Sequence, residues 1–210
     1  MNIQLDVPQI LQKPELPNGC EITSLCQVLR FLGCPADKCD LADHYLPRSE
    51  FWYGTDPDRF YMGDPHRDDD VTDPRTGYYC FAGPIVEAAN RYLRGQYSAE
   101  EPPYIAVDLT GADEPQLIRQ LEEGRPFIFW ASLHFEDIQY DKCGQYQLPD
   151  GRYHRVFHQL HCMVCKGADD SFFYIADPLD YNERVPREQF MKIYRQLGSR
   201  AVVLKAMEMH

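Results

Sequence analysis

The sequence predicts an α+β protein in which a helical first half packs on a mainly antiparallel sheet from the second half. Apolar residues before about position 100 recur mostly at helical spacing. After it, short apolar runs bounded by turn residues dominate. We expect one domain over residues 1–210, with a helical lobe at about 1–100 and a sheet lobe at about 101–210.

The first half is expected to be helical after an extended start. Apolar residues recur at helical spacing from Cys20 up to a stop at Gly33, and the stripe is wide enough for a helix in the centre of a core. Asp37 fits the N-cap of a short second helix. The expected elements are an extended segment at 3–11, helices at 20–33, 36–46 and 83–94, and a long loop rich in aromatic residues, Asp and Pro at 47–80.

The second half alternates strands with two helices. The runs HQLHCMVCKG and SFFYIADP predict two neighbouring strands, because the turn GADD joins them. Consecutive strands joined by a tight turn pair in an antiparallel manner. The expected strands lie at 104–109, 125–133, 158–167, 171–178 and 200–206, and the expected helices lie at 113–124 and 186–198.

The charge balance limits the partners of the protein. The formal net charge is −12, which repels phosphate backbones and anionic lipid heads, so nucleic acid is not expected as a partner. No apolar run reaches the roughly 20 residues that span a bilayer, so membrane insertion is not expected. The first residues do not form a signal peptide, so we expect a cytoplasmic protein, or a secreted one if a leader was removed.

The chain contains 8 cysteines. In a chain of this size, without a leader and with enough apolar residues for a core, we expect most of them to be reduced and buried.

Cys20 stands out because it occupies the start of the predicted central helix. The unpaired N–H groups and the partial positive charge of a helix N-terminus favour a thiolate over a thiol. The alternative is that Cys20 is simply one of several small apolar residues. A nucleophile also needs a base, a group that orients the base, and an oxyanion hole.

Three further residues supply those roles. His161 lies in an apolar strand, where an imidazole needs a polar partner. Asp177 ends the neighbouring strand, so its carboxylate can reach His161 and fix the tautomer of the ring. Gln12 lies in the loop before Cys20, where its amide can face an oxyanion beside the Cys20 N–H. The candidate catalytic residues are therefore Cys20, His161, Asp177 and Gln12.

Two metal alternatives compete with this interpretation. His158, His161, Cys162 and Cys165 can all bind zinc, but along a strand 161 and 165 face one way and 158 and 162 the other. The acidic segment at 56–73 suggests calcium, but Phe60 occupies a position that needs an oxygen ligand. We therefore expect no metal and no cofactor.

Four stretches of the chain carry a family resemblance: LDVPQILQKPELPNGCEITSLCQVLRFLG, GYYCFAGPIVEAANRYL, HCMVCKGADDSFFYIADPL and LGSRAVVL. In this order they resemble the stand-alone bacterial relatives of the bacteriocin-processing, double-glycine leader peptidases, which are papain-like cysteine peptidases. The resemblance covers nearly the whole chain, and its most specific part is the run Pro-x-Gly-Cys-Glu at Cys20. The transporter-associated members usually have an aspartate directly before the nucleophile, whereas this chain has Gly19.

The resemblance implies a papain-like fold, with Cys20 as nucleophile, His161 as base, Asp177 as the residue that orients it and Gln12 in the oxyanion hole. It implies a cysteine peptidase that cleaves a peptide or protein substrate through an acyl-enzyme. Two alternatives stay open: a papain-fold acyltransferase or transamidase, in which an amine replaces water, and an inactive module that binds peptides.

Overall fold

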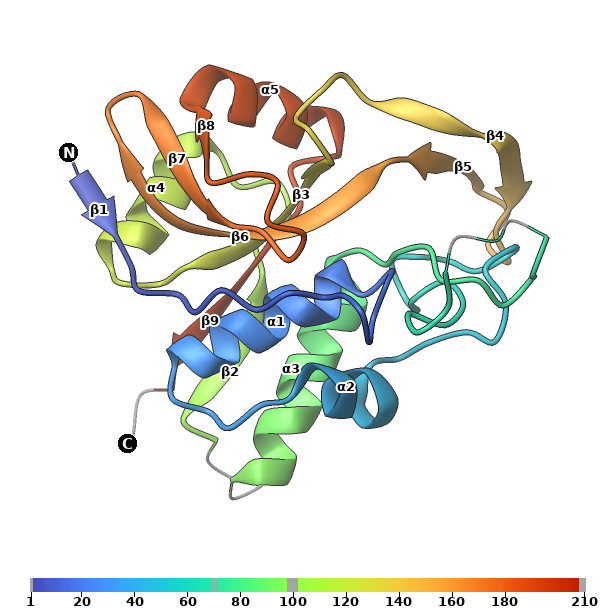
Figure 1. The fold of residues 1–210 in the computed structure, drawn as a ribbon, viewed down its shortest axis with the longest axis horizontal. Coiled ribbons are helices and arrows are strands. Elements are labelled where there is room, and N and C mark those ends of the chain that lie inside the picture. The colour runs from blue at the N-terminus through green and yellow to red at the C-terminus, as the bar shows by residue number, and fades with distance from the viewer. Residues whose placement is uncertain (1, 69, 71, 98–101, 208–210) are drawn as a thin grey trace.

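An antiparallel sheet forms the centre of the molecule (Figure 1). The computed structural model describes residues 2–68, 70, 72–97 and 102–207, and seven strands of these residues pair into this sheet. They are β1 (Asn2–Gln4), β2 (Tyr104–Asp108), β3 (Phe127–Ser132), β6 (Leu160–Asp169), β7 (Phe172–Ala176), β8 (Arg184–Pro186) and β9 (Ala201–Ala206). Their order is β2-β9-β3-β6-β7-β8, and β1 also pairs with β6.

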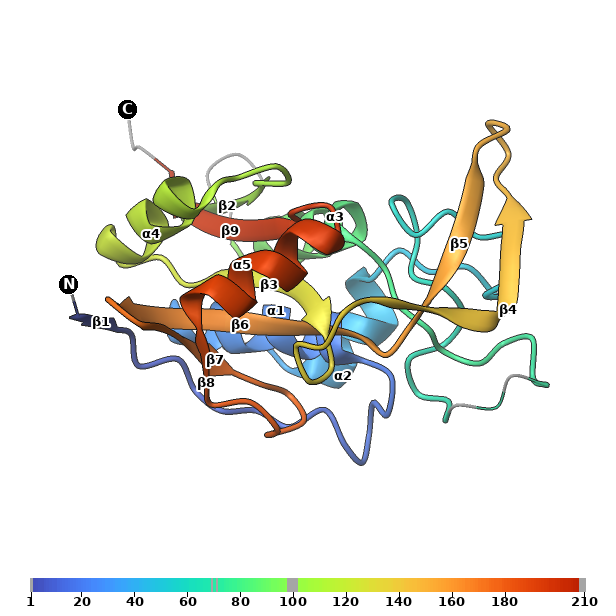
Figure 2. The same cartoon turned by 90° about the horizontal axis from the view of Figure 1, so that it is seen from above.

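Helices cover both faces of the sheet (Figures 1 and 2). On one face lie α1 (Cys20–Phe31) and α3 (Ala82–Gln96), with the short α2 (Lys38–Asp40) and the π-helical turn η1 (Leu41–Tyr45) beside them. On the other face lie α4 (Glu114–Glu122) and α5 (Arg187–Gln196). The α+β prediction is confirmed. In the described parts of the chain, no helix combines the length and the apolar character needed to cross a membrane.

The strand β3 shows why the sheet lies between two helical layers. All of its residues are buried. Ile128 and Trp130 pack in the core that α1 and α3 share, whereas Phe127 and Phe129 pack in the core of α4 and α5. Successive side chains of a strand point to opposite faces, so a strand covered on both faces is a continuous apolar run.

The helix α1 is central, as its sequence pattern predicts. Every residue from its first position to Leu29 is buried. The polar side chains among them are used internally: the Ser24 hydroxyl donates to the Cys162 carbonyl at 3.2 Å, and the Gln27 amide donates to the Ile10 carbonyl at 3.3 Å. The second of these bonds joins the helix to the extended segment that precedes it. Asp37 caps α2 as expected, because its side chain accepts from two backbone N–H groups.

A second sheet was not expected from the sequence. It is a hairpin of β4 (Gln139–Gln147) and β5 (Tyr153–His158), which extends beside the segment 47–80 (Figure 2). The expected single strand at 158–167 is wrong at its start, because Gln159 has a φ of 53° and separates β5 from β6. A left-handed residue breaks the strand and turns the chain into the hairpin.

The hairpin is attached to the segment 47–80 by aromatic side chains. The Tyr146 hydroxyl donates to the Thr55 carbonyl at 2.6 Å. The Tyr79 hydroxyl accepts from the Phe157 N–H at 3.0 Å and donates to His154 Nε2 at 2.8 Å. Burial lowers the pKa of His154 to about 4, so the imidazole is neutral at neutral pH and can accept this bond.

In its described residues the segment 47–80 contains no helix or strand, yet it packs against the body of the protein. Trp52 and Tyr61 are buried in the body of the protein, whereas Tyr53 is exposed and its ring packs against Tyr146 of the hairpin. Gly63 marks a close approach of two parts of the segment: it has a φ of 81°, and a Cβ added there would lie 2.0 Å from the Thr76 carbonyl oxygen.

Gly63 and Gly33 form a matched pair for a stability test, since both have a φ of 81° but a Cβ on Gly33 would meet nothing. We expect Gly33→Ala to cost about 1–2 kcal/mol, the penalty of the left-handed region. Gly63→Ala should cost about 1–3 kcal/mol more, because the added methyl group collides with backbone. Urea unfolding measures both values, and equal losses would contradict this account of the segment.

Candidate active site

Cys20 is the first residue of α1 and lies at the bottom of a cleft. Gly19 is the N-cap, and it makes no side-chain cap. A Cβ on this glycine would lie 2.6 Å from Leu16 Cβ, so the chain approaches the nucleophile position too closely for a larger residue. The backbone of Cys162, the residue after His161, hydrogen bonds to the Cys20 sulfur. The candidate nucleophile and the strand of the candidate base are therefore in direct contact.

The surroundings of Cys20 act against the expected thiolate. The sequence predicts that the helix terminus favours the thiolate, but burial raises the pKa of the Cys20 thiol well above its ordinary value. The carboxylates of Glu21 and Asp177 raise it further, while the hydrogen bond from Cys162 acts in the opposite direction. Only 6% of Cys20 is exposed, so the loss of hydration opposes the effect of the helix terminus.

Glu21 is a buried carboxyl group next to the candidate nucleophile, and the sequence analysis missed this environment. The residue is 0% exposed. Its Oε2 accepts from the Cys20 thiol at 3.3 Å, and its Oε1 accepts from the Cys80 N–H at 3.1 Å. Burial raises the pKa of Glu21 to about 7, although both hydrogen bonds act to lower it.

His161 and Asp177 are paired as the sequence predicts. His161 Nε2 lies 2.6 Å from Asp177 Oδ1, and both side chains are buried. The carboxylate accepts hydrogen bonds only, so Nε2 carries the proton and Nδ1 is the nitrogen that can accept one. The turn between β6 and β7 produces this pairing, because it places the end of one strand beside the start of the other.

Asp177 is held by four hydrogen bonds. Besides His161, Oδ1 accepts from the Leu179 N–H at 2.8 Å. Oδ2 accepts from the N–H and the side-chain amide of Asn182, at 3.1 and 2.7 Å. Burial alone would raise the pKa of Asp177, but these donors and the imidazole lower it below its ordinary value. The sequence analysis assigned no role to Asn182, because no local pattern marks it.

Gln12 lies in the same cleft as Cys20 and His161. Its backbone N–H donates to the Pro178 carbonyl at 3.0 Å, which joins its segment to the residue after Asp177. Its side-chain amide nitrogen donates to the Pro17 carbonyl at 2.5 Å. The amide is therefore fixed against the loop that leads into Cys20.

The cleft has a volume of about 440 Å³. It brings together residues that are far apart in the chain: the segment before α1, the start of α1, the segment 47–80, the residue after β3, the hairpin, the start of β6 and the turn after β7. Its walls are largely aromatic and aliphatic, with Tyr78, Tyr79, Phe157, Leu160, Leu179 and Tyr181 among them. Asp177 does not line the cleft and lies behind His161 instead.

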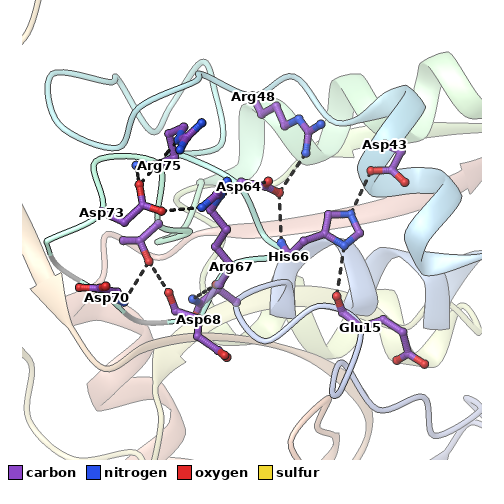
Figure 3. A network of polar contacts seen from close by, with 12 residues as sticks. Glu15, Asp43, Arg48, Asp64, His66, Arg67, Asp68, Asp70, Asp73 and Arg75 are labelled. Carbon is purple, nitrogen blue, oxygen red and sulfur yellow. Dashed lines mark hydrogen bonds and ion pairs between the residues drawn. The ribbon is translucent and has the colours of Figure 1, made fainter.

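A polar network attaches the long segment to the loop before the nucleophile (Figure 3). The Asn18 side chain donates to the Arg67 carbonyl at 2.8 Å. His66 lies between two acceptors, the Glu15 carbonyl at 3.2 Å from Nδ1 and the Asp43 carboxylate at 2.9 Å from Nε2. Exposed ion pairs are individually weak, so the network acts mainly by fixing the position of this loop.

Neither the zinc nor the calcium alternative has a cluster of ligands among the described residues. Cys162 packs in the core beside α1, and Cys165 packs in the core on the opposite face of the sheet. Within the described chain, no three His, Cys, Asp or Glu side chains converge as ligands. All seven cysteines whose side chains the structure describes are free thiols.

Comparison with known proteins confirms the family resemblance. The fold is that of the papain-like C39 peptidases: a crystal structure of a candidate C39-like peptidase from Bacillus anthracis matches with a TM-score of 0.82 and 28% identity, over 100% of both chains. This chain belongs to the Peptidase_C39 like family, whose model matches residues 4–202.

Two further proteins match this chain. The uncharacterized protein YvpB of Bacillus subtilis (strain 168) is 30% identical over 200 residues, which cover 93% of this chain and 72% of that protein. A double glycine motif protease from an AMS/PCAT transporter, solved with its leader peptide, aligns over 99% of both chains with a TM-score of 0.48 and 15% identity.

The raised pKa of Glu21 predicts a pH-dependent stability. The group ionises near pH 4.5 in the unfolded chain and near 7 in the folded one, so the stability that this group contributes is highest below pH 4.5 and falls as the pH rises to 7. We expect Glu21→Gln to raise the free energy of unfolding by about 3 kcal/mol above pH 7 and by much less at pH 5. Denaturant unfolding at both pH values measures this. The exposed Glu122→Gln is the control and should show no such difference.

Asn182 should be required to hold the buried Asp177 carboxylate. Asn182→Ala removes the 2.7 Å donor to Oδ2, and we expect a loss of about 1.5–3 kcal/mol, as for other hydrogen bonds to charged groups. Asn182→Asp should lose more, because it places a second carboxylate against the first. A change below about 0.5 kcal/mol in urea unfolding for the alanine variant would show that the contact is unimportant.

Proposed function

We propose that this protein is a cysteine peptidase, with Cys20 as nucleophile, His161 as base, Asp177 as the residue that orients His161, and Gln12 in the oxyanion hole. The observation that carries the proposal is that Cys20 and His161 line one cleft while Asp177 accepts from the far nitrogen of the imidazole. Family membership supports the same chemistry.

In the proposed mechanism, His161 Nδ1 takes the proton of the Cys20 thiol, and the thiolate attacks the carbonyl carbon of a peptide bond. The Gln12 amide and the Cys20 N–H donate to the resulting oxyanion. His161 then gives its proton to the leaving amine, and the acyl group stays on the sulfur. Water, deprotonated by His161, releases the carboxylate product and regenerates the thiol.

Asp177 acts through His161. Its position keeps the proton on Nε2, so Nδ1 is free of a proton when the thiol needs an acceptor. Its negative charge also stabilises the imidazolium that forms with the thiolate. The four donors around it keep the carboxylate ionised and in one orientation.

The substrate is proposed to be a peptide or protein segment. The cleft is open along walls formed by distant segments of the chain, and its apolar rings suit the side chains of a peptide. We also propose that residues 1–210 act as one domain, because β1 and β9, from the two ends of the chain, join the same sheet.

A peptide-cleavage assay tests the proposal. We expect the wild type to hydrolyse members of a broad peptide library and Cys20→Ala to lose at least about 1,000-fold in rate. Cys39→Ala is the matched control, since Cys39 is a partly exposed thiol outside the cleft, and it should keep the wild-type rate.

The same assay separates the alternatives. Mass spectrometry of products formed with an added amine distinguishes hydrolysis from acyl transfer, since a transferred acyl group appears as a new amide. Peptide binding that Cys20→Ala leaves unchanged, with no turnover by the wild type, would overturn the proposal in favour of a binding module.

A further inference from the structure

Glu21 is placed to act on the nucleophile although the proposed mechanism gives it no role. Its Oε2 lies 3.3 Å from the Cys20 sulfur, which is hydrogen-bond distance for a thiol donor. The opposite oxygen, Oε1, accepts from the Cys80 N–H, and the Cys80 carbonyl accepts from the Trp130 indole at 2.8 Å. The backbone of Cys80 thus holds one oxygen of the Glu21 carboxyl group, and the other oxygen faces the Cys20 sulfur.

The surroundings of Glu21 make its charge important. The titratable groups that face it are the thiols of Cys20, Cys80 and Cys162 and the phenol of Tyr61, and the charge of Glu21 raises the pKa of each. From the end of β7, the Asp177 carboxylate adds a further negative charge near the same sulfur, and His161 lies in the same cleft. These groups come from α1, β6, the turn after β7 and the segment 47–80.

We propose that Glu21 controls the ionisation of Cys20: as a carboxylate it keeps the proton on the sulfur, and as a neutral carboxyl group it donates a hydrogen bond to the thiolate. The inference rests on the proposed function, in which Cys20 is the nucleophile.

The proton balance shows why the two forms differ. In both, activation moves one proton from the Cys20 sulfur to His161 Nδ1. With Glu21 ionised, the product has two negative charges 3.3 Å apart in a buried site, and the thiol also loses its acceptor bond. With Glu21 protonated, its O–H turns toward the thiolate and stabilises it. Since burial raises the pKa of Glu21 to about 7, both forms are populated near neutral pH.

Glu21→Gln tests the proposal because the amide is neutral at every pH, can donate to the sulfur through Nε2 and can still accept from the Cys80 N–H. The measurement is the rate of iodoacetamide alkylation of Cys20 against pH, followed by mass spectrometry of the peptide that contains it. We expect the midpoint of the profile to shift down by about one pH unit or more. Glu122→Gln, which removes the same charge from an exposed position, should leave it unchanged.

A merely structural role for Glu21 would change the limiting alkylation rate without moving the midpoint. A midpoint that is unchanged or higher in Glu21→Gln would therefore overturn the inference.

A second measurement does not require a variant at Glu21. Carbon-13 NMR of labelled glutamate carboxyl groups follows the titration of Glu21 in the wild type and in Cys20→Ala. The thiol donor lowers the pKa of Glu21, so its removal should raise the midpoint of this titration by several tenths of a pH unit or more. Identical titrations in the two proteins would show that the two groups do not interact, which also overturns the inference.

The two proposals can fail separately. Alkylation reports the thiolate whether or not any peptide is cleaved. A shifted midpoint in a protein that cleaves no peptide would uphold the role of Glu21 and overturn the peptidase. Peptide cleavage that depends on Cys20, together with an alkylation midpoint that Glu21→Gln does not shift, would uphold the peptidase and overturn the role of Glu21.

Discussion

The packing of the first turn of α1 against the start of β6 is the contact on which the site depends. The Ser24 hydroxyl and the Cys20 sulfur both hydrogen bond to the backbone of Cys162, so the helix cannot shift along the strand without breaking these bonds. This contact holds Cys20, which begins the helix, against Cys162, the residue that follows His161. The contact therefore brings α1 and the strand that carries His161 to the same cleft.

The same burial has a chemical cost. A helix that is buried from its first residue can be held rigidly, but its terminal cysteine is then removed from water along with Glu21. Two acids in one dry site cannot both ionise easily. The position of the Cys20 sulfur and its reactivity as the proposed nucleophile are therefore two separate properties. Packing fixes the position of the Cys20 sulfur, and in the proposed mechanism its reactivity depends on which of the neighbouring groups carry protons.

Much of this arrangement could be predicted from the sequence, because strong local patterns matched the tertiary structure. The apolar periodicity after Cys20, the cap at Asp37 and the turn that pairs β6 with β7 all rest on short-range rules. The hairpin could not be predicted in the same way, since the run QYDKCGQYQ is polar and its stability comes from Tyr79 and Thr55, which are far away in sequence. The burial of Glu21 likewise depends on β6 and on the segment before α3, and no local signal reports that.

The attachment of the hairpin to the segment 47–80 has a consequence for how the family could diversify. Tyr146 and His154 of the hairpin are hydrogen bonded to Thr55 and Tyr79 of the segment, and residues of both parts line the cleft. The hairpin and the segment 47–80 therefore form one unit, held together by contacts between aromatic rings and by hydrogen bonds of tyrosine hydroxyl groups. A homologue could acquire a differently shaped binding surface by exchanging this unit as a whole, while the helix and strand beneath it stay as they are. Exchange of either segment alone would leave the other without its contacts.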